Sequence, residues 1–132
     1  MGAYRTPVPV KPGLSAAVEL VVAEADTAVA LRSGTVAVLG TPRLIALCEE
    51  ASVIAIRDEL EPAITSVGMK VQLDHLAPTA IGQKVKAEAT VEKVNGRRVT
   101  FMVSVNDDRG LVAVGRVTRV IVDVERFLDK TR

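Results

Sequence analysis

Apolar and polar residues alternate along the second half of the chain in a way that predicts antiparallel strands. A period of two indicates strands over Ser66–Leu76, Gln83–Val94, Arg97–Asp107 and Leu111–Val122. Asn95-Gly96 and Asp108-Arg109-Gly110 separate the last three strands, and Asn-Gly between alternating residues is a strong hairpin signal. These three strands are therefore expected to form an antiparallel meander.

The first half of the chain predicts shorter strands. Leu14–Val22 mixes small and β-branched residues as strands do. Ala28–Leu31 and Thr35–Leu39 are shorter β-prone pieces around the turn pair Ser33-Gly34. Residues 1–13 contain three prolines and are expected to form an extended segment, followed by a single domain over residues 14–132.

One long helix is predicted between the two sets of strands. Thr41 suits the N-cap and Pro42 the first helical position, because the cap hydroxyl can bond an unpaired amide and proline has none. The helix should end near Leu60, before Pro62, and Val124–Lys130 should add a short terminal helix. This order is an α+β pattern with a curved antiparallel sheet around one long central helix, which is typical of the hotdog fold.

The helix places its two adjacent glutamates in different environments. Arg43, Glu50 and Arg57 recur every seventh position and form a narrow polar stripe that should face water. Glu49 instead falls on an apolar side, among Ile45, Ser52, Val53 and Ile56. A carboxylate in such surroundings must be paired or shifted in pKa, and acid–base residues arise in this way. The alternative is that Glu49 lies at the helix margin and reaches solvent.

His75 shares the apolar phase of its strand with Val67, Met69, Val71 and Leu73. It is the single histidine of the chain and stands at the end of the strand, where it could reach a cleft. A hydrogen-bonded core histidine is the alternative. Thr41 is explained equally by capping, but a hydroxyl, a histidine and a carboxylate together are the groups used in acyl transfer.

Composition narrows the class of protein. The 132 residues are 48% hydrophobic and 25% charged with a net charge of +1, which indicates a folded chain. A near-neutral charge and three aromatic residues argue against nucleic-acid binding. One histidine and one cysteine are too few for a metal centre, and no cofactor is indicated. The N-terminus lacks the apolar run of a signal peptide or membrane anchor, so a cytoplasmic location is expected.

Two stretches, Gly40-Thr-Pro-Arg-Leu-Ile-Ala-Leu-Cys-Glu-Glu-Ala-Ser52 and Ser66-Val-Gly-Met-Lys-Val-Gln-Leu-Asp-His-Leu-Ala-Pro-Thr-Ala80, resemble the fluoroacetyl-CoA thioesterase group of hotdog proteins. The resemblance continues through Asn95-Gly96-Arg97-Arg98 and Gly115-Arg116-Val117-Thr118-Arg119. It implies hydrolysis of an acyl-CoA thioester. By matching motifs it implies that Thr41, Glu49 and His75 are catalytic and that Gly68 and Arg119 bind substrate.

The sequence differs from this family in one segment. The fluoroacetate-specialised member has phenylalanines just before its helix that cover the acyl group, whereas residues 32–40 here contain no aromatic residue. We therefore expect another short or medium acyl-CoA as substrate. A helix with apolar residues on two sides should also bury its second side against another copy, so a homodimer is expected, with a tetramer as the alternative.

Two other functions fit the same fold. One is an acyl-CoA hydratase or dehydratase, since a fold does not determine its chemistry. Those enzymes, by resemblance, place an aspartate and a histidine together at the start of the helix, whereas the histidine here lies on a later strand. The other is a non-catalytic acyl-CoA binding protein, which would bind the thioester without hydrolysing it.

Overall fold

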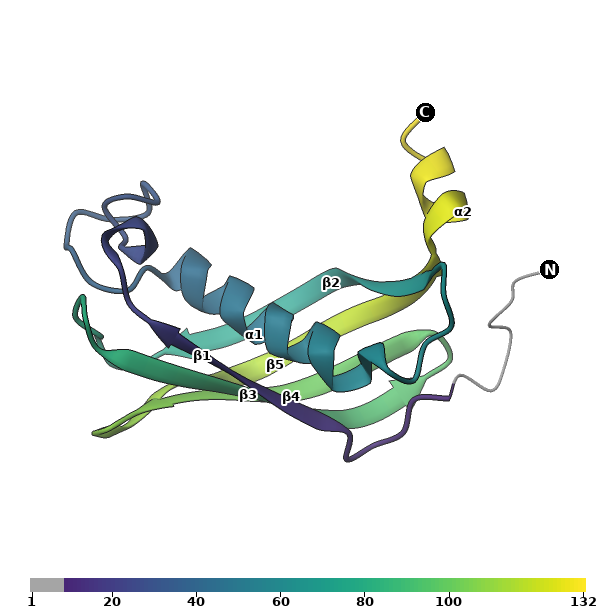
Figure 1. Ribbon diagram of the computed structural model, residues 1–132, viewed down its shortest axis with the longest axis horizontal. Coiled ribbons are helices and arrows are strands. Elements are labelled where there is room, and N and C mark those ends of the chain that lie inside the picture. The colour runs from purple at the N-terminus through teal and green to yellow at the C-terminus, as the bar shows by residue number, and fades with distance from the viewer. Residues whose placement is uncertain (1–8) are drawn as a thin grey trace.

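The computed structural model describes residues 9–132 and shows one sheet that curves around a single long helix (Figure 1). The long helix is α1 (Thr41–Arg57), and η1 (Glu24–Asp26) and α2 (Val124–Asp129) are short. The sheet has five antiparallel strands, β1 (Ser15–Val21), β2 (Ile64–His75), β3 (Lys84–Asn95), β4 (Arg98–Asp107) and β5 (Gly110–Asp123). This confirms the predicted architecture.

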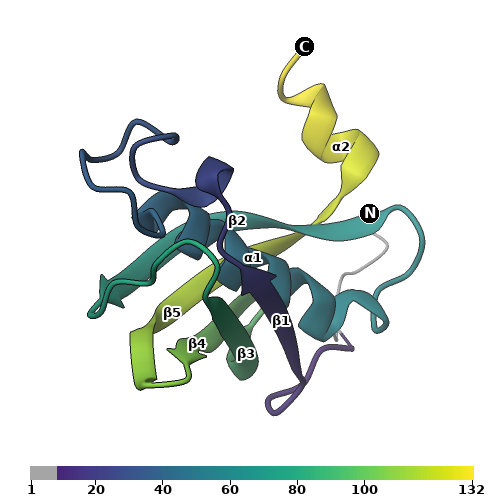
Figure 2. The same ribbon diagram turned by 60° about the vertical axis from the view of Figure 1, so that its left-hand side comes forward.

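The strand order is β1-β3-β4-β5-β2, so β1 and β2 form the two edges of the sheet (Figure 2). The predicted meander β3-β4-β5 is present. Asn95 pairs with Arg98 across the first hairpin, and Gly96 within its loop has φ of 63°, a conformation that glycine adopts without strain. Strand β2 joins the far side of β5, which brings the strand that follows the helix next to the last strand of the meander.

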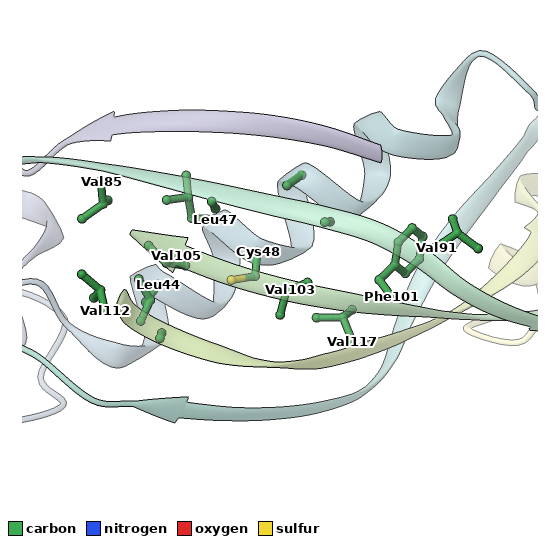
Figure 3. Close-up of a cluster of buried hydrophobic side chains, with 14 of the residues drawn as sticks. Leu44, Leu47, Cys48, Val85, Val91, Phe101, Val103, Val105, Val112 and Val117 are labelled. Carbon is green, nitrogen blue, oxygen red and sulfur yellow. The ribbon is translucent and has the colours of Figure 1, made fainter. Parts of the chain in front are cut away.

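The core lies between α1 and the concave face of the sheet (Figure 3). The helix contributes a fully buried face of Leu44, Leu47, Cys48 and Ala51, and it packs on small and branched side chains of the strands. From the strands come Val85, Ala87, Ala89, Val91, Val99, Phe101, Val103, Val105, Val112 and Val117. Val10 is also buried there, so the core includes a residue of the N-terminal segment. The rest of that predicted segment, residues 1–8, lies outside the described residues.

Two β-bulges bend the sheet at the same level. One lies in β2 between Gly68 and Lys70, and the other lies in β3 between Val91 and Lys93. Lys70 pairs with Thr118, which pairs with Thr100, which pairs with Lys93, so both irregularities fall in one row across four strands. A bulge adds a residue and strengthens the local twist. The paired bulges therefore help to curl the sheet around α1.

The bulge in β2 makes part of the predicted alternation wrong. The sequence pattern places Val67 and Met69 on the same face as Leu73 and His75. In the structure, Met69 is 48% exposed, while Ser66 is buried against the helix side. The extra residue at Met69 exchanges the two faces of the strand before it, and an apolar residue at an exposed bulge gives no sequence signal for this.

Two other predictions in the first half of the chain are corrected. Ala28–Leu31 forms a turn, in which Leu31 N–H donates to the Thr27 carbonyl at 3.0 Å, so the backbone folds back on itself and does not continue as a strand. Residues 35–39 are not a strand, and β-bridges occur only at Val38 and Leu39.

The helix begins and ends earlier than the sequence pattern predicts. Its N-cap is Gly40 and not Thr41, and it ends at Arg57, before the predicted Leu60. The short helix α2 follows β5 and points away from the sheet (Figure 1); Asp123 caps it by accepting a hydrogen bond from Arg126 N–H at 3.1 Å. Within residues 9–132, no helix has the length and apolar character needed to cross a bilayer.

Candidate active site

Thr41 and His75 meet where α1 begins and β2 ends. The Thr41 Oγ1 and His75 Nδ1 atoms are 2.8 Å apart, a hydrogen-bond distance. Since Gly40 occupies the N-cap, Thr41 is the first helical residue, and no side-chain cap bond forms at this terminus. The hydroxyl therefore serves the histidine and does not cap the helix. When Thr41 donates to Nδ1, the ring proton lies on Nε2; in the other tautomer the roles reverse.

The start of α1 is anchored by the preceding segment. Gly40 N–H donates to the Asp26 carbonyl at 2.9 Å, and the Asp26 carboxylate pairs with Arg43 at 3.0 Å. A β-carbon at Gly40 would come within 3.0–3.1 Å of Ala28 backbone atoms, so a larger residue does not fit there without movement. These contacts fix the position of Thr41 relative to the sheet.

Glu49 lies farther along α1 and belongs to a second group of polar side chains. Its Oε2 atom accepts a hydrogen bond from Arg119 Nη1 at 3.0 Å. Arg119 Nε donates to Ser66 Oγ at 2.8 Å, and Arg119 Nη2 donates to the Ser66 carbonyl at 2.9 Å. Glu50, by contrast, is exposed, as the helix wheel predicts. The carboxylate that sequence analysis selects is thus the one held by an arginine of the sheet.

Gly68 provides the space that the Glu49 carboxylate occupies. Gly68 pairs with Arg119 across β2 and β5. A β-carbon at this glycine would lie 2.5 Å from Glu49 Oε2, which is closer than real β-carbons approach other atoms. The three predicted residues Glu49, Gly68 and Arg119 therefore form one contiguous group.

Burial sets the electrostatics of this group. Arg119 is 7% exposed, and this burial lowers the pKa of its guanidinium, while the Glu49 carboxylate acts in the opposite direction. Burial also raises the pKa of the Cys48 thiol to about 11, with a further contribution from Glu49. The thiol is consequently protonated near neutral pH and is not a candidate nucleophile.

The two groups do not meet within one chain. Glu49 lies eight residues after Thr41, which is about 12 Å along a helix axis. Gly68 lies in the first half of β2 and His75 is its last residue, about 20 Å away for an extended strand. The structure brings Thr41 to His75 and brings Glu49 to Gly68 and Arg119, and among residues 9–132 no hydrogen bond joins one group to the other.

Two features of the site could not be predicted from the sequence: the part played by Ser66, and the unpaired Nε2 atom of His75. Ser66 gave no signal because its position belongs to the polar phase of the uninterrupted strand pattern. His75 Nε2 is buried and has no hydrogen-bond partner among the described residues, and the same holds for Thr79 Oγ1. An unpaired buried nitrogen on a ring that already binds a hydroxyl is available to a reacting group or a further partner.

Other parts of the described chain do not extend this site. No group of three or more potential metal ligands lies together in residues 9–132. A hollow of about 190 Å³ lies on the outer face of the sheet, lined by Lys70, Glu92, Lys93 and Arg116 among others. There Arg116 is already paired with Glu92 through bonds of 2.9 and 3.0 Å. This hollow is separated from both groups by the sheet itself.

Comparison with known proteins shows the family to which the chain is related. The family model described as fluoroacetyl-CoA-specific thioesterase matches residues 22–125. A fluoroacetyl-CoA thioesterase from Streptantibioticus cattleyicolor is 33% identical over 95 residues, which cover 72% of this chain and 68% of the relative.

Solved structures give the same result. A structure of a fluoroacetyl-CoA thioesterase superposes with a TM-score of 0.88 at 28% identity, covering 93% of this chain and 96% of the other. A thioesterase superfamily member from Thermus thermophilus superposes with a TM-score of 0.85 at 29% identity, covering 96% of this chain and 92% of the other. A hotdog-like protein from Thermanaerovibrio acidaminovorans superposes with a TM-score of 0.84 at 26% identity, covering 91% of this chain and 89% of the other.

The curved sheet around one helix is thus a hotdog fold, and with these relatives it defines a thioesterase. Within that class, the chain belongs to the fluoroacetyl-CoA-specific thioesterase family. It is therefore a thioester hydrolase, and the predicted fold and enzyme class are confirmed.

Proposed function

We propose that this protein hydrolyses short or medium acyl-CoA thioesters to the free acid and CoA, with Thr41, Glu49 and His75 as catalytic residues. The observation that carries the proposal is the 2.8 Å contact between Thr41 Oγ1 and His75 Nδ1 at the start of α1. A hydroxyl bonded to an imidazole is the arrangement by which proton transfer activates an oxygen. The amino end of a 17-residue helix adds a favourable dipole for a developing oxyanion.

The reaction replaces a carbon–sulfur bond with a carbon–oxygen bond. In one route Glu49 or Thr41 activates a water molecule that attacks the carbonyl carbon, and the bond to sulfur breaks. In the other route the Glu49 or Thr41 oxygen attacks, the bond to sulfur breaks, and water then hydrolyses the acyl-enzyme to release the acid and regenerate the side chain. His75 carries the proton that is released to the CoA thiolate, so water supplies the acid's oxygen and the thiol's proton. Arg119 is the residue that holds the Glu49 carboxylate and, with Gly68, lines the acyl pocket in this proposal.

Relatives support CoA as the carrier of the acyl group. Variants of the fluoroacetyl-CoA thioesterase have been solved with fluoroacetate and CoA and with acetyl-CoA. The preferred acyl group is proposed to be one other than fluoroacetyl, because residues 32–40 contain no aromatic side chain that could cover the acyl group. Exposed aliphatic residues, including Val29, Leu31 and Val36, lie in the segment before α1.

We also propose that the active enzyme is a cytoplasmic homodimer, with a tetramer as a further possibility, and that its sites form between the two chains. Strand β2 is an edge, so its outer backbone groups can pair with another strand. The second apolar side of α1 is only half-covered at Ile45 and Val53. The single cysteine is a free, buried thiol, as is common in reducing compartments.

Antiparallel pairing of β2 with the same strand of a second copy explains the separated groups. Such a pair is related by a two-fold axis, and it places the beginning of one strand beside the end of the other. The Glu49–Arg119 group of one protomer would then approach the Thr41–His75 pair of its partner. Each dimer would hold two equivalent composite sites.

Release of free thiol from a panel of acyl-CoA esters tests the activity. The panel runs from acetyl and fluoroacetyl to longer chains, and the native protein is compared with Thr41→Ala and His75→Ala. We expect turnover by the native protein, strongest on short or medium non-fluorinated chains, and a loss of about 100-fold or more in His75→Ala. A folded native protein that binds the esters without releasing thiol would be a binding protein, and the proposal would fail.

A further inference from the structure

We propose that Ser66 is a positioning residue of this enzyme, which orients the Arg119 guanidinium so that one of its nitrogens holds Glu49. The inference rests on the proposed function, since it assigns Ser66 a part in the same reaction. It concerns a residue that acts through Arg119 and does not itself touch the substrate.

Ser66 occupies two of the three guanidinium nitrogens. Its Oγ accepts from Arg119 Nε at 2.8 Å, and its backbone carbonyl accepts from Nη2 at 2.9 Å. A guanidinium is planar and rigid, so two fixed nitrogens also fix the direction of the third. The third, Nη1, is the one that donates to Glu49 Oε2 at 3.0 Å. One serine thus determines where the carboxylate is held.

Burial makes this arrangement depend on the serine. Ser66 and Arg119 are each 7% exposed, so water cannot readily replace a lost hydroxyl. The Glu49 side chain is 34% exposed, and the residue beside its carboxylate, Gly68, has no side chain that could contact it. Glu49 therefore has little to fix it besides Arg119. Removing the Ser66 hydroxyl leaves Nε unpaired and the guanidinium held on one edge only.

Kinetics of Ser66 variants test the proposal. In Ser66→Ala we expect kcat to fall about 10- to 100-fold while KM changes less than about threefold, because misplacing a catalytic group by a fraction of an ångström lowers the rate and leaves binding largely intact. Ser66→Thr keeps the hydroxyl and should recover kcat to within about threefold of native. Ser104→Ala, at a sheet serine that faces away from α1, is the control and should behave as native.

A double-mutant cycle shows whether Ser66 acts through Arg119. In an Arg119→Ala background, Ser66→Ala should cause no further loss of kcat. Independent losses that multiply would overturn the proposal, as would a Ser66→Ala variant that keeps native kcat per folded molecule. If Ser66→Ala does not fold, Ser66→Cys takes its place, because a thiol keeps the side-chain volume and accepts hydrogen bonds only weakly.

An NMR measurement separates this inference from the proposed function. The Arg119 Nε–H resonance, identified by its loss in Arg119→Lys, should exchange slowly with water in the native protein and at least about tenfold faster in Ser66→Ala. This readout needs no turnover. An inactive native protein would overturn the proposed function, whereas equal exchange rates in the two proteins would overturn the role of Ser66.

Discussion

Glu49 and Glu50 are neighbours in sequence, yet one is bonded to Arg119 and the other faces solvent. Replacing Glu49 by Gln keeps its shape and removes its charge, so we expect thiol release to fall about 100-fold or more. Glu50→Gln should stay within about twofold of native, because surface substitutions rarely matter. Equal losses in the two variants would show that the arginine-bound carboxylate has no special part in the reaction.

Cys48 packs against the sheet beside Glu49, and burial raises the pKa of its thiol to about 11. At pH 8 only about one molecule in a thousand carries the thiolate, the form that reacts with disulfide reagents. We therefore expect no labelling of the folded protein by a chromogenic disulfide within an hour, and stoichiometric labelling in guanidinium chloride. Rapid labelling of the native protein would contradict the burial of this residue, and it would also disturb assays that use the same reagent to detect CoA.

The environment of a residue could be predicted from the sequence where it depends on neighbouring residues of the same helix or strand. The helical wheel of α1 separates Glu49 from Glu50 because the residues on each side of the helix all come from one short stretch of sequence. Ser66 was missed because its partner Arg119 is 53 positions away and its face depends on the bulge at Met69. The bond from Thr41 to His75 also joins distant segments, and capping offered a simpler explanation for the threonine.

Gly115 of β5 pairs with Leu73 of β2, and the backbone of β2 fills the space beside it. A β-carbon there would overlap the Gln72 carbonyl and press on Leu73. We expect Gly115→Ala to reduce the free energy of unfolding by about 3 kcal/mol or more, because backbone atoms must separate to admit it. Urea unfolding would measure the change. Val114→Ala, at a 37% exposed neighbour, is the control and should cost less than about 1 kcal/mol.

The predicted elements hold best where periodicity is long. The meander β3-β4-β5 and the helix were found within a few residues of their observed limits. Ala28–Leu31 and Thr35–Leu39 failed because β propensity forms a strand only if a partner strand lies alongside. The fold between residues 22 and 40 is set instead by contacts with Gly40 and Arg43, which the local pattern does not contain.

At the scale of the whole molecule, active sites formed by residues of both chains lead to a quantitative prediction. When Glu49→Ala and His75→Ala chains are mixed and allowed to exchange, half of the dimers are mixed, and each has one site with both residues intact. Activity should therefore rise from near zero to about a quarter of the native value. The mixture is unfolded and refolded together before the assay, and each variant refolded alone is the control.

The outcome of this mixing experiment also reports on a single-chain site. If Thr41, His75 and Glu49 of the same chain cooperate, every site in a mixed dimer carries one defect. Activity would then stay at the level of the separate variants, and the proposed pairing of β2 edges would lose its main functional argument. Sedimentation of the native protein would show whether dimers are present at assay concentrations.

The bulge in β2 has a consequence that can be counted along the chain. Gly68 and His75 both face α1, yet they are seven positions apart, and in an unbroken strand only an even separation keeps two residues on one side. Val91 and Val94 in β3 show the same odd separation across the second bulge. A relative with one residue fewer between the glycine and the histidine would turn one of them outward. Such a relative could keep every catalytic residue type and still be unable to assemble the site.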